Sequence, residues 1–168
     1  MYTPGKSKEY IRDGVFHFFK ECKHIITLPN LYFGLEQRFL DEGIKVDCSE
    51  YKVNTFKGAV QLKPKDITLF NTNVKYLNLS KYDGLFFDLY GTWNKSMEES
   101  LPRINKNARL VITFLMGREH LNLQKIIDIK HREESYVKLL SKYGFKTIKY
   151  INYCDTTPMC VFYCIKIR

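Results

Sequence analysis

The sequence has little of what marks secreted, metal-binding or membrane-spanning proteins. Its 5 cysteines are odd in number and form no Cys-x-x-Cys pair, which argues against a disulfide framework or a zinc site and favours a reducing compartment. The 4 histidines have no nearby cysteine at metal-ligand spacing, so we expect no bound metal. No window approaches about 18 apolar residues, and residues 1–8 contain no apolar region of the signal-peptide type. These absences predict a cytoplasmic protein.

Two enzyme signatures are missing as well. No Gly-x-Ser-x-Gly nucleophile motif occurs, and Pro4-Gly5-Lys6-Ser7 lacks the leading glycine of a phosphate-binding loop. Alanine is scarce, whereas Lys, Asn, Ile and Tyr are abundant, a bias typical of AT-rich genomes such as those of viruses, plasmids and low-GC bacteria. For a viral or mobile-element protein, the expected compartment is the host cytoplasm.

What the sequence does have is a large apolar fraction and an excess of positive charge. Hydrophobic residues make up 45% of the 168 residues, including 12 Tyr and 12 Phe, which predicts one folded domain over residues 1–168. The net charge of +9 favours a polyanionic partner, with nucleic acid first. Because the basic residues are spread along the chain, a solvated lysine-rich surface is the alternative.

Hydrophobic periodicity predicts helices that alternate with strands. Apolar residues recur at helical spacing in residues 6–21, 31–42 and 131–143, a further helix is expected at 96–103, and 51–63 is a short helix or an irregular crossing. We expect the first helix, within residues 1–22, to pack on the sheet. Gly43 and Gly144 are expected to end the helices that precede them. Strand-length apolar runs occupy residues 25–28, 44–49, 67–70, 84–88, 110–115, 145–153 and 159–167.

The segment 82–93, Tyr-Asp-Gly-Leu-Phe-Phe-Asp-Leu-Tyr-Gly-Thr-Trp, is the most informative part of this pattern. Its apolar run predicts a strand buried on both faces of a parallel sheet, and the run ends at Asp88. Open α/β sheets bind ligands at the carboxyl ends of their strands, so Asp88 is a candidate site residue. Alternatively, Asp88 merely caps the turn that follows.

The order of elements resembles the class I S-adenosylmethionine-dependent methyltransferases across nearly the whole chain. The resemblance implies an α/β, Rossmann-like three-layer sandwich with a mostly parallel seven-stranded sheet that ends in an antiparallel C-terminal hairpin. It also implies S-adenosylmethionine as the cofactor. No metal is needed for methyl transfer, which depends mainly on in-line positioning.

Three positions carry the family's site residues over to this sequence. Glu50 closes the second strand, where the family places the acid that binds the ribose hydroxyls, and a carboxylate suits that role. Asn71 or Asn73 follows the third strand, where the family contacts adenine. Asp88 closes the fourth strand, at the catalytic-loop position, and also borders the cofactor. The alternative for Glu50 is an ordinary solvated acid at a strand end.

The loop Asp88-Leu89-Tyr90-Gly91-Thr92 resembles the Asp-Pro-Phe-Gly-Ser segment of tRNA guanine dimethyltransferases and the Asp-Pro-Pro-Tyr segment of amino-methylating enzymes. In both groups the loop holds an exocyclic amine between a polar group and an aromatic face. The resemblance therefore implies that Asp88 and Tyr90 are catalytic and that the substrate is an amine of nucleic acid. Tyr90 and Trp93 either stack on a flipped base or pack against the sheet edge.

The first strand departs from the family. It runs into Leu28, Pro29 and Asn30 instead of a Gly-x-Gly loop, and the one remaining glycine, Gly34, is expected inside the helix. Either these three residues line the methionine end of the cofactor in a modified way, or the cofactor is no longer bound. The second possibility makes the chain a non-catalytic scaffold that binds nucleic acid or protein on a methyltransferase-like fold.

A basic segment beyond the fifth strand is the last candidate region. Within residues 116–132, Arg118 and Lys125 are expected to contact a phosphate backbone, with a solvated helix face as the alternative. A chain of this size is expected to have no separate target-recognition domain, so the alternatives for target recognition include a protein partner or a homodimer.

Overall fold

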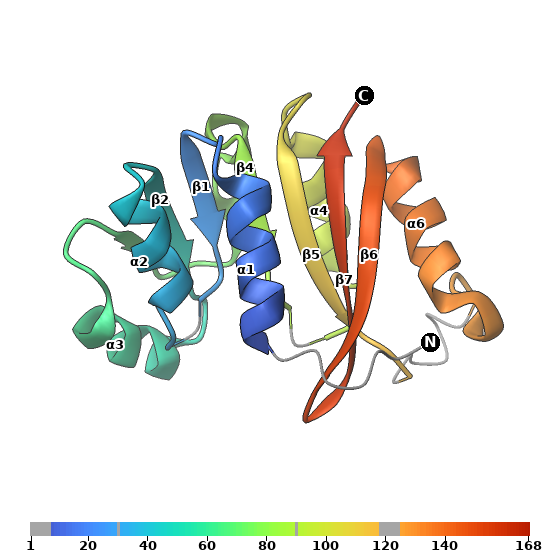
Figure 1. Cartoon of the computed structure of the whole chain (residues 1–168), viewed down its shortest axis with the longest axis horizontal. Helices are drawn as coiled ribbons and strands as arrows, with labels where there is room; N and C mark the ends of the chain where they lie inside the picture. The colour runs from blue at the N-terminus through green and yellow to red at the C-terminus, as the bar shows by residue number, and fades with distance from the viewer. Residues whose placement is uncertain (1–7, 30, 90, 118–124) are drawn as a thin grey trace.

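The computed structural model describes residues 8–29, 31–89, 91–117 and 125–168. These residues form one seven-stranded sheet in the order β3-β2-β1-β4-β5-β7-β6 (Figure 1). Strands β1 to β5 pair in parallel, and β7 is antiparallel to both β5 and β6. The predicted fold class is confirmed. The strands are β1 (His24–Thr27), β2 (Lys45–Ser49), β3 (Thr68–Phe70), β4 (Gly84–Phe87), β5 (Arg109–Leu115), β6 (Phe145–Asp155) and β7 (Thr157–Lys166).

Helices cover both faces of the sheet and complete the three layers (Figure 1). One face carries α1 (Lys8–Phe19), α2 (Gly34–Asp41) and α3 (Val53–Leu62), and the other carries α4 (Lys95–Ser100) and α6 (Arg132–Lys142). The apolar stripe of α1 lies buried against α2 and the sheet, as expected from its spacing. Short 3₁₀ turns connect β3 to β4 at Val74–Tyr76 and Leu79–Lys81, follow α4 at Leu101–Arg103 and precede α6 at Ile129–His131.

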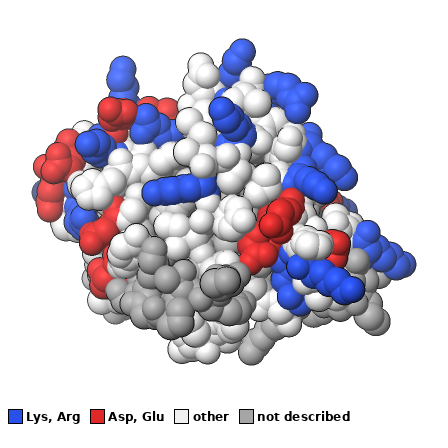
Figure 2. Space-filling view, turned by 45° about the vertical axis from the view of Figure 1, so that its right-hand side comes forward, with Lys and Arg blue, Asp and Glu red and all other residues white. Residues whose placement is uncertain are grey.

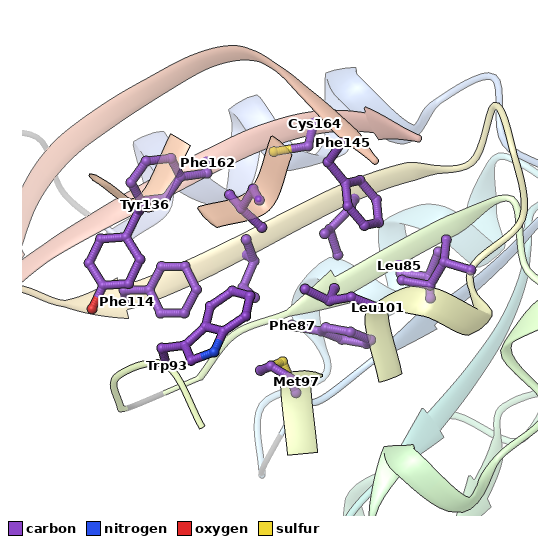
Figure 3. Close-up of a cluster of buried hydrophobic side chains, with 14 of the residues drawn as sticks. Leu85, Phe87, Trp93, Met97, Leu101, Phe114, Tyr136, Phe145, Phe162 and Cys164 are labelled. Carbon is purple, nitrogen blue, oxygen red and sulfur yellow. The ribbon is translucent and has the colours of Figure 1, made fainter. Parts of the chain in front are cut away.

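The core under α4 and α6 contains several aromatic side chains among aliphatic ones (Figure 3). The rings of Phe114 and Tyr136 stack with centroids 4.3 Å apart, and Phe162 meets Phe114 edge-on at 5.8 Å. Such pairs stabilise a fold by about 0.5–1.5 kcal/mol beyond their area burial. They join β5, β7 and α6 and so hold the antiparallel hairpin against the parallel part of the sheet.

The structure refines several predicted boundaries. Gly43 and Gly144 have φ values of +77° and +83°, which suit glycine after a helix, as predicted. Within residues 51–63, Val53–Leu62 form the regular helix α3. Helix α2 begins at Gly34 rather than at residue 31, because the preceding residues form a turn closed by the bond from Tyr32 N–H to the Pro29 carbonyl. Among the described residues, no helix is long and apolar enough to cross a membrane.

Candidate functional site

A cavity of about 630 Å³ opens at the carboxyl ends of the parallel strands. This volume falls in the range of small-molecule sites. The lining includes the residues after β1 and β4, the neighbouring strands between which the strand order reverses, and α/β sheets bind ligands at this switch point. Its lining includes residues that follow four different strands: Leu28 after β1, Ser49, Glu50, Tyr51 and Lys52 at the end of β2, Thr72, Asn73 and Val74 after β3, and Asp88, Leu89 and Gly91 after β4.

Glu50 lies in this cavity with one carboxylate oxygen fixed. The backbone N–H of Lys52 donates to Glu50 Oε1 at 2.7 Å, and the backbone N–H of Glu50 donates to the Phe70 carbonyl at 2.9 Å. Glu50 is therefore held at the end of β2, and its second oxygen can accept hydrogen bonds from a ligand.

Of the two asparagines after β3, Asn73 lines the cavity and Asn71 is exposed outside its lining. The Asn73 Oδ1 atom accepts from the Lys75 backbone N–H at 3.1 Å and from Ser96 Oγ at 3.3 Å. These bonds fix the side-chain amide, and its NH₂ group can donate to an acceptor such as an adenine ring nitrogen.

Asp88 is held by strand β5. The hydroxyl of the buried Thr113 lies 3.0 Å from Asp88 Oδ1 and 3.1 Å from the Leu89 carbonyl, and its single hydrogen serves these two acceptors. The Leu115 N–H donates to the Gly91 carbonyl at 2.8 Å and ties down the same loop. Asp88 Oδ2 lies 3.8 Å from Lys8 Nζ, and the Asp88 side chain is 26% exposed. The loop is thus anchored while Asp88 borders the cavity.

Trp93 does not reach the cavity. Its side chain is 6% exposed and packs against Phe114 (Figure 3). It also packs against Tyr143 and donates from Nε1 to Glu98 Oε1 at 3.0 Å. A ring that is buried in the core cannot stack on a base. The prediction of Trp93 as a substrate-binding residue is therefore corrected, and packing is its observed role.

The remaining predicted residues fall into three groups. Asn30, Tyr90 and Arg118 lie outside the described residues. Pro29 is half-buried and Lys125 is exposed, and neither belongs to the cavity lining formed by described residues. Of the two described members of the modified loop, Leu28 lines the cavity.

The most notable residue that sequence reasoning missed is Glu36, in the first turn of α2. It is only 3% exposed, and its Oε2 atom has no hydrogen-bond partner among the described residues. Burial raises the pKa of Glu36 to about 7. The available signal was its position, because Glu36 adjoins Leu35 and precedes Phe39 by three residues, inside the apolar stripe of the helix. Lys52, Thr55, Asn94, Lys95 and Ser96 also line the cavity and were not predicted.

On the face shown in Figure 2, charged side chains are spread rather than concentrated. Lysine and arginine side chains are interspersed with acidic ones across the face shown in Figure 2, and the basic residues outnumber the acidic ones in the sequence. Within the described ranges, no group of three or more His, Cys, Asp or Glu side chains is arranged to hold a metal ion.

Comparison with protein-family models and with curated protein sequences finds no match. Solved structures do match. A magnesium protoporphyrin IX methyltransferase from Synechocystis, solved with bound S-adenosylhomocysteine, aligns over 93% of this chain and 82% of its own at 14% identity, with a TM-score of 0.68. A 1,6-didemethyltoxoflavin N1-methyltransferase from Burkholderia thailandensis, also with S-adenosylhomocysteine, aligns over 96% and 80% at 12% identity, with a TM-score of 0.67.

A protein from Pyrococcus horikoshii that has been proposed to be an RNA methyltransferase aligns over 97% of this chain and 86% of its own, at 12% identity and a TM-score of 0.66. These structural neighbours act on varied substrates, and the first two hold S-adenosylhomocysteine. The identities are low, so the likeness shows the fold alone. The chain has the fold of the class I S-adenosylmethionine-dependent methyltransferases.

Proposed function

We propose that this chain is an S-adenosylmethionine-dependent methyltransferase that acts on an amine of a nucleic acid. The observation that carries the proposal is the cavity at the switch point of the sheet, which brings Glu50, Asn73 and Asp88 together from three strands. When bound, the cofactor would supply a methyl group on a sulfonium ion.

The residues of the cavity fit such a cofactor chemically. Glu50 has a carboxylate oxygen available for ribose hydroxyls, because the Lys52 N–H occupies only the other oxygen. Asn73 would donate from its amide to adenine, and it is preferred to Asn71 because it lines the cavity. Leu28 would contact the methionine end.

Asp88 would accept a hydrogen bond from the target amine. The Thr113 hydroxyl positions this carboxylate through Oδ1, which leaves Oδ2 for the amine once Lys8 has moved from its position 3.8 Å away. Tyr90 would be the aromatic residue that stacks on the target base, because Trp93 is buried.

Charge supports nucleic acid as the substrate class. The chain carries a net charge of +9, and Lys52 and Lys95 line the cavity. Lysines beside a site can bind phosphates and position a nucleic-acid backbone. We assign the same role to Arg118 and Lys125.

Calorimetric titration with S-adenosylmethionine separates the enzyme from a non-catalytic scaffold. The wild-type chain should bind, and Glu50→Gln should weaken binding by roughly tenfold or more because a charged hydrogen bond is lost. Glu42→Gln, at an exposed acid that follows α2, is the matched control and should bind normally. The scaffold reading would replace the methyltransferase reading if the wild type showed no binding up to about millimolar ligand.

A radiolabel transfer assay on DNA, RNA and protein pools then tests the substrate. Asp88→Asn should abolish transfer while cofactor binding and the unfolding midpoint stay close to wild type. Asp66→Asn, at an exposed acid in a turn outside the cavity lining, should leave transfer unchanged. Full activity of Asp88→Asn would remove Asp88 from the mechanism, and label in protein alone would overturn the nucleic-acid assignment.

A further inference from the structure

Glu36 lies near the end of β1, the strand next to which the strand order of the sheet reverses. The pKa of Glu36 is affected by hydrogen bonding with the Thr27 side chain, and Thr27 is the last residue of β1. Thr27 pairs with Cys48 of β2 on one side and with Phe86 of β4 on the other. The Glu36 carboxyl therefore lies near the carboxyl end of β1, and the next residue of the chain after Thr27, Leu28, lines the cavity.

This carboxyl has an incomplete set of partners. Its Oε2 atom accepts no hydrogen bond, and no ion pair within 4.0 Å includes Glu36 among the described residues. The groups that face it are the Thr27 hydroxyl from β1, the Cys48 thiol from β2, the Arg12 guanidinium from α1 and the Asp88 carboxylate after β4. A buried carboxylate without a cation in contact is unfavourable, so a compact cation beside it would be strongly favoured.

A second observation points to a cation on this side of the cavity. The Lys8 ammonium group, at the start of α1, already lies 3.8 Å from Asp88 Oδ2. The Asp88 carboxylate raises the pKa of Glu36, so the two acids repel each other. An ammonium group that entered between them would relieve the repulsion between two acids.

We propose that Glu36 is the acid that binds the α-ammonium group of the cofactor's methionine part, an inference that rests on the proposed function. Glu36 is buried and is not itself part of the cavity lining, so the subsite forms when the ligand displaces the side chains that cover this carboxyl. It replaces backbone contacts that a glycine loop would offer and that Pro29 restricts.

Binding of the ammonium group should release a proton. Without ligand, the raised pKa of about 7 leaves part of the Glu36 population protonated at neutral pH. The positive charge of the ligand favours the carboxylate, so the O–H bond of Glu36 breaks and the proton passes to the buffer. The number of protons released should fall toward zero as the pH rises well above the pKa.

Calorimetry in buffers of different ionisation enthalpy measures this release directly. The two probes are S-adenosylhomocysteine, which carries the ammonium group, and 5′-methylthioadenosine, which lacks the amino-acid part. In the wild type, the first should bind with proton release and the second without it. Glu36→Gln should weaken the binding of S-adenosylhomocysteine by roughly tenfold or more and abolish the proton release that accompanies it. The binding of 5′-methylthioadenosine should stay as in the wild type. Glu42→Gln, at the exposed end of α2, is the control that should change neither.

The outcomes separate this inference from the proposed function. If both probes bind and Glu36→Gln leaves the affinity and proton release of S-adenosylhomocysteine unchanged, the role of Glu36 is wrong and the cofactor site stands. If neither probe binds the wild type, both proposals fail. Should Glu36→Gln not fold, Glu36→Asp keeps the charge and should retain proton release with weaker binding. Wild-type affinity with no proton release in that variant would overturn the inference.

Discussion

Two buried carboxylates on opposite faces of the sheet differ in how completely they are paired. Asp47 on β2 and Glu36 on α2 are 2% and 3% exposed. Asp47 Oδ2 accepts from Tyr82 Oη at 2.8 Å and lies 3.1 Å from Lys81 Nζ and 3.0 Å from His24 Nε2. Glu36 Oε2 has no such partner among the described residues.

The difference in partners sets opposite pKa shifts. Burial alone would raise the pKa of Asp47, but the hydrogen bonds from Tyr82 and Lys81, together with the nearby His24, outweigh burial and lower it. At Glu36 burial dominates and raises the pKa to about 7. The paired acid therefore stabilises the fold, whereas the charged form of Glu36 has partners too weak to offset its burial and would gain from a cation bound beside it. The comparison predicts that stability depends on Asp47 and ligand binding on Glu36.

The largest effect is expected for Asp47→Asn. The neutral amide of the variant would no longer pair with the charged Lys81 or with His24. Breaking a buried ion pair typically lowers the free energy of unfolding by about 3–5 kcal/mol. We expect about 3 kcal/mol, at the low end of that range, because Lys81 is partly exposed. Urea denaturation measures the change, with the exposed Asp66→Asn as control. A loss below about 1 kcal/mol would show that the network does not stabilise the fold.

Glu36→Gln should remove a pH dependence of stability whose sign is opposite to that of Asp47. The folded-state pKa of about 7 exceeds the ordinary value of 4.5, so between these pH values the folded chain binds a proton that the unfolded chain has lost. Wild-type stability should therefore fall as the pH rises through this window, by up to about 3 kcal/mol. Glu36→Gln removes this slope, and Glu42→Gln keeps it. Urea unfolding at a series of pH values tests this, and an unchanged slope in Glu36→Gln would contradict the assignment.

The fold and part of the site followed from local sequence patterns. Alternating apolar runs gave the strand and helix order because strand and helix periods differ, and Asp88 and Glu50 were found because each closes such a run. The local sequence around Trp93 could not decide its role, because the burial of this ring depends on Phe114 and Tyr143, which come from other parts of the chain.

The two buried carboxylates were harder to find. Asp47 interrupts an apolar strand, and its partners His24 and Tyr82 come from β1 and from the segment before β4. Glu36 looks like an ordinary acid in the first turn of a helix, where the dipole favours it. Whether such an acid is paired depends on tertiary contacts, which a sequence pattern does not contain.

Tyr82→Phe tests the paired carboxylate by removing one donor. Tyr82 is buried, so the loss of a hydrogen bond to a charged group should lower the free energy of unfolding by about 2 kcal/mol. The lowered pKa of Asp47 contributes stability above its ordinary value of 3.8, and this stability is lost as the pH falls through the folded pKa. Tyr82→Phe should shift that acid loss to higher pH, whereas the exposed Tyr76→Phe should not. An unshifted acid transition would show that Lys81 and His24 suffice.

Thr27→Val makes the corresponding change beside Glu36 and should have the smallest effect. The Thr27 hydroxyl favours the charged form of Glu36, so its removal should raise the pKa of Glu36 further above 7 and lower stability by about 1 kcal/mol. Stability should then continue to fall at higher pH than in the wild type. The two donor deletions raise the pKa of their carboxyls alike, yet Tyr82→Phe alters the acid range and Thr27→Val the neutral to alkaline range. Urea unfolding across both pH ranges distinguishes the two variants. If Tyr82→Phe changed stability in the neutral to alkaline range instead of the acid range, the contrast between the two acids would be wrong.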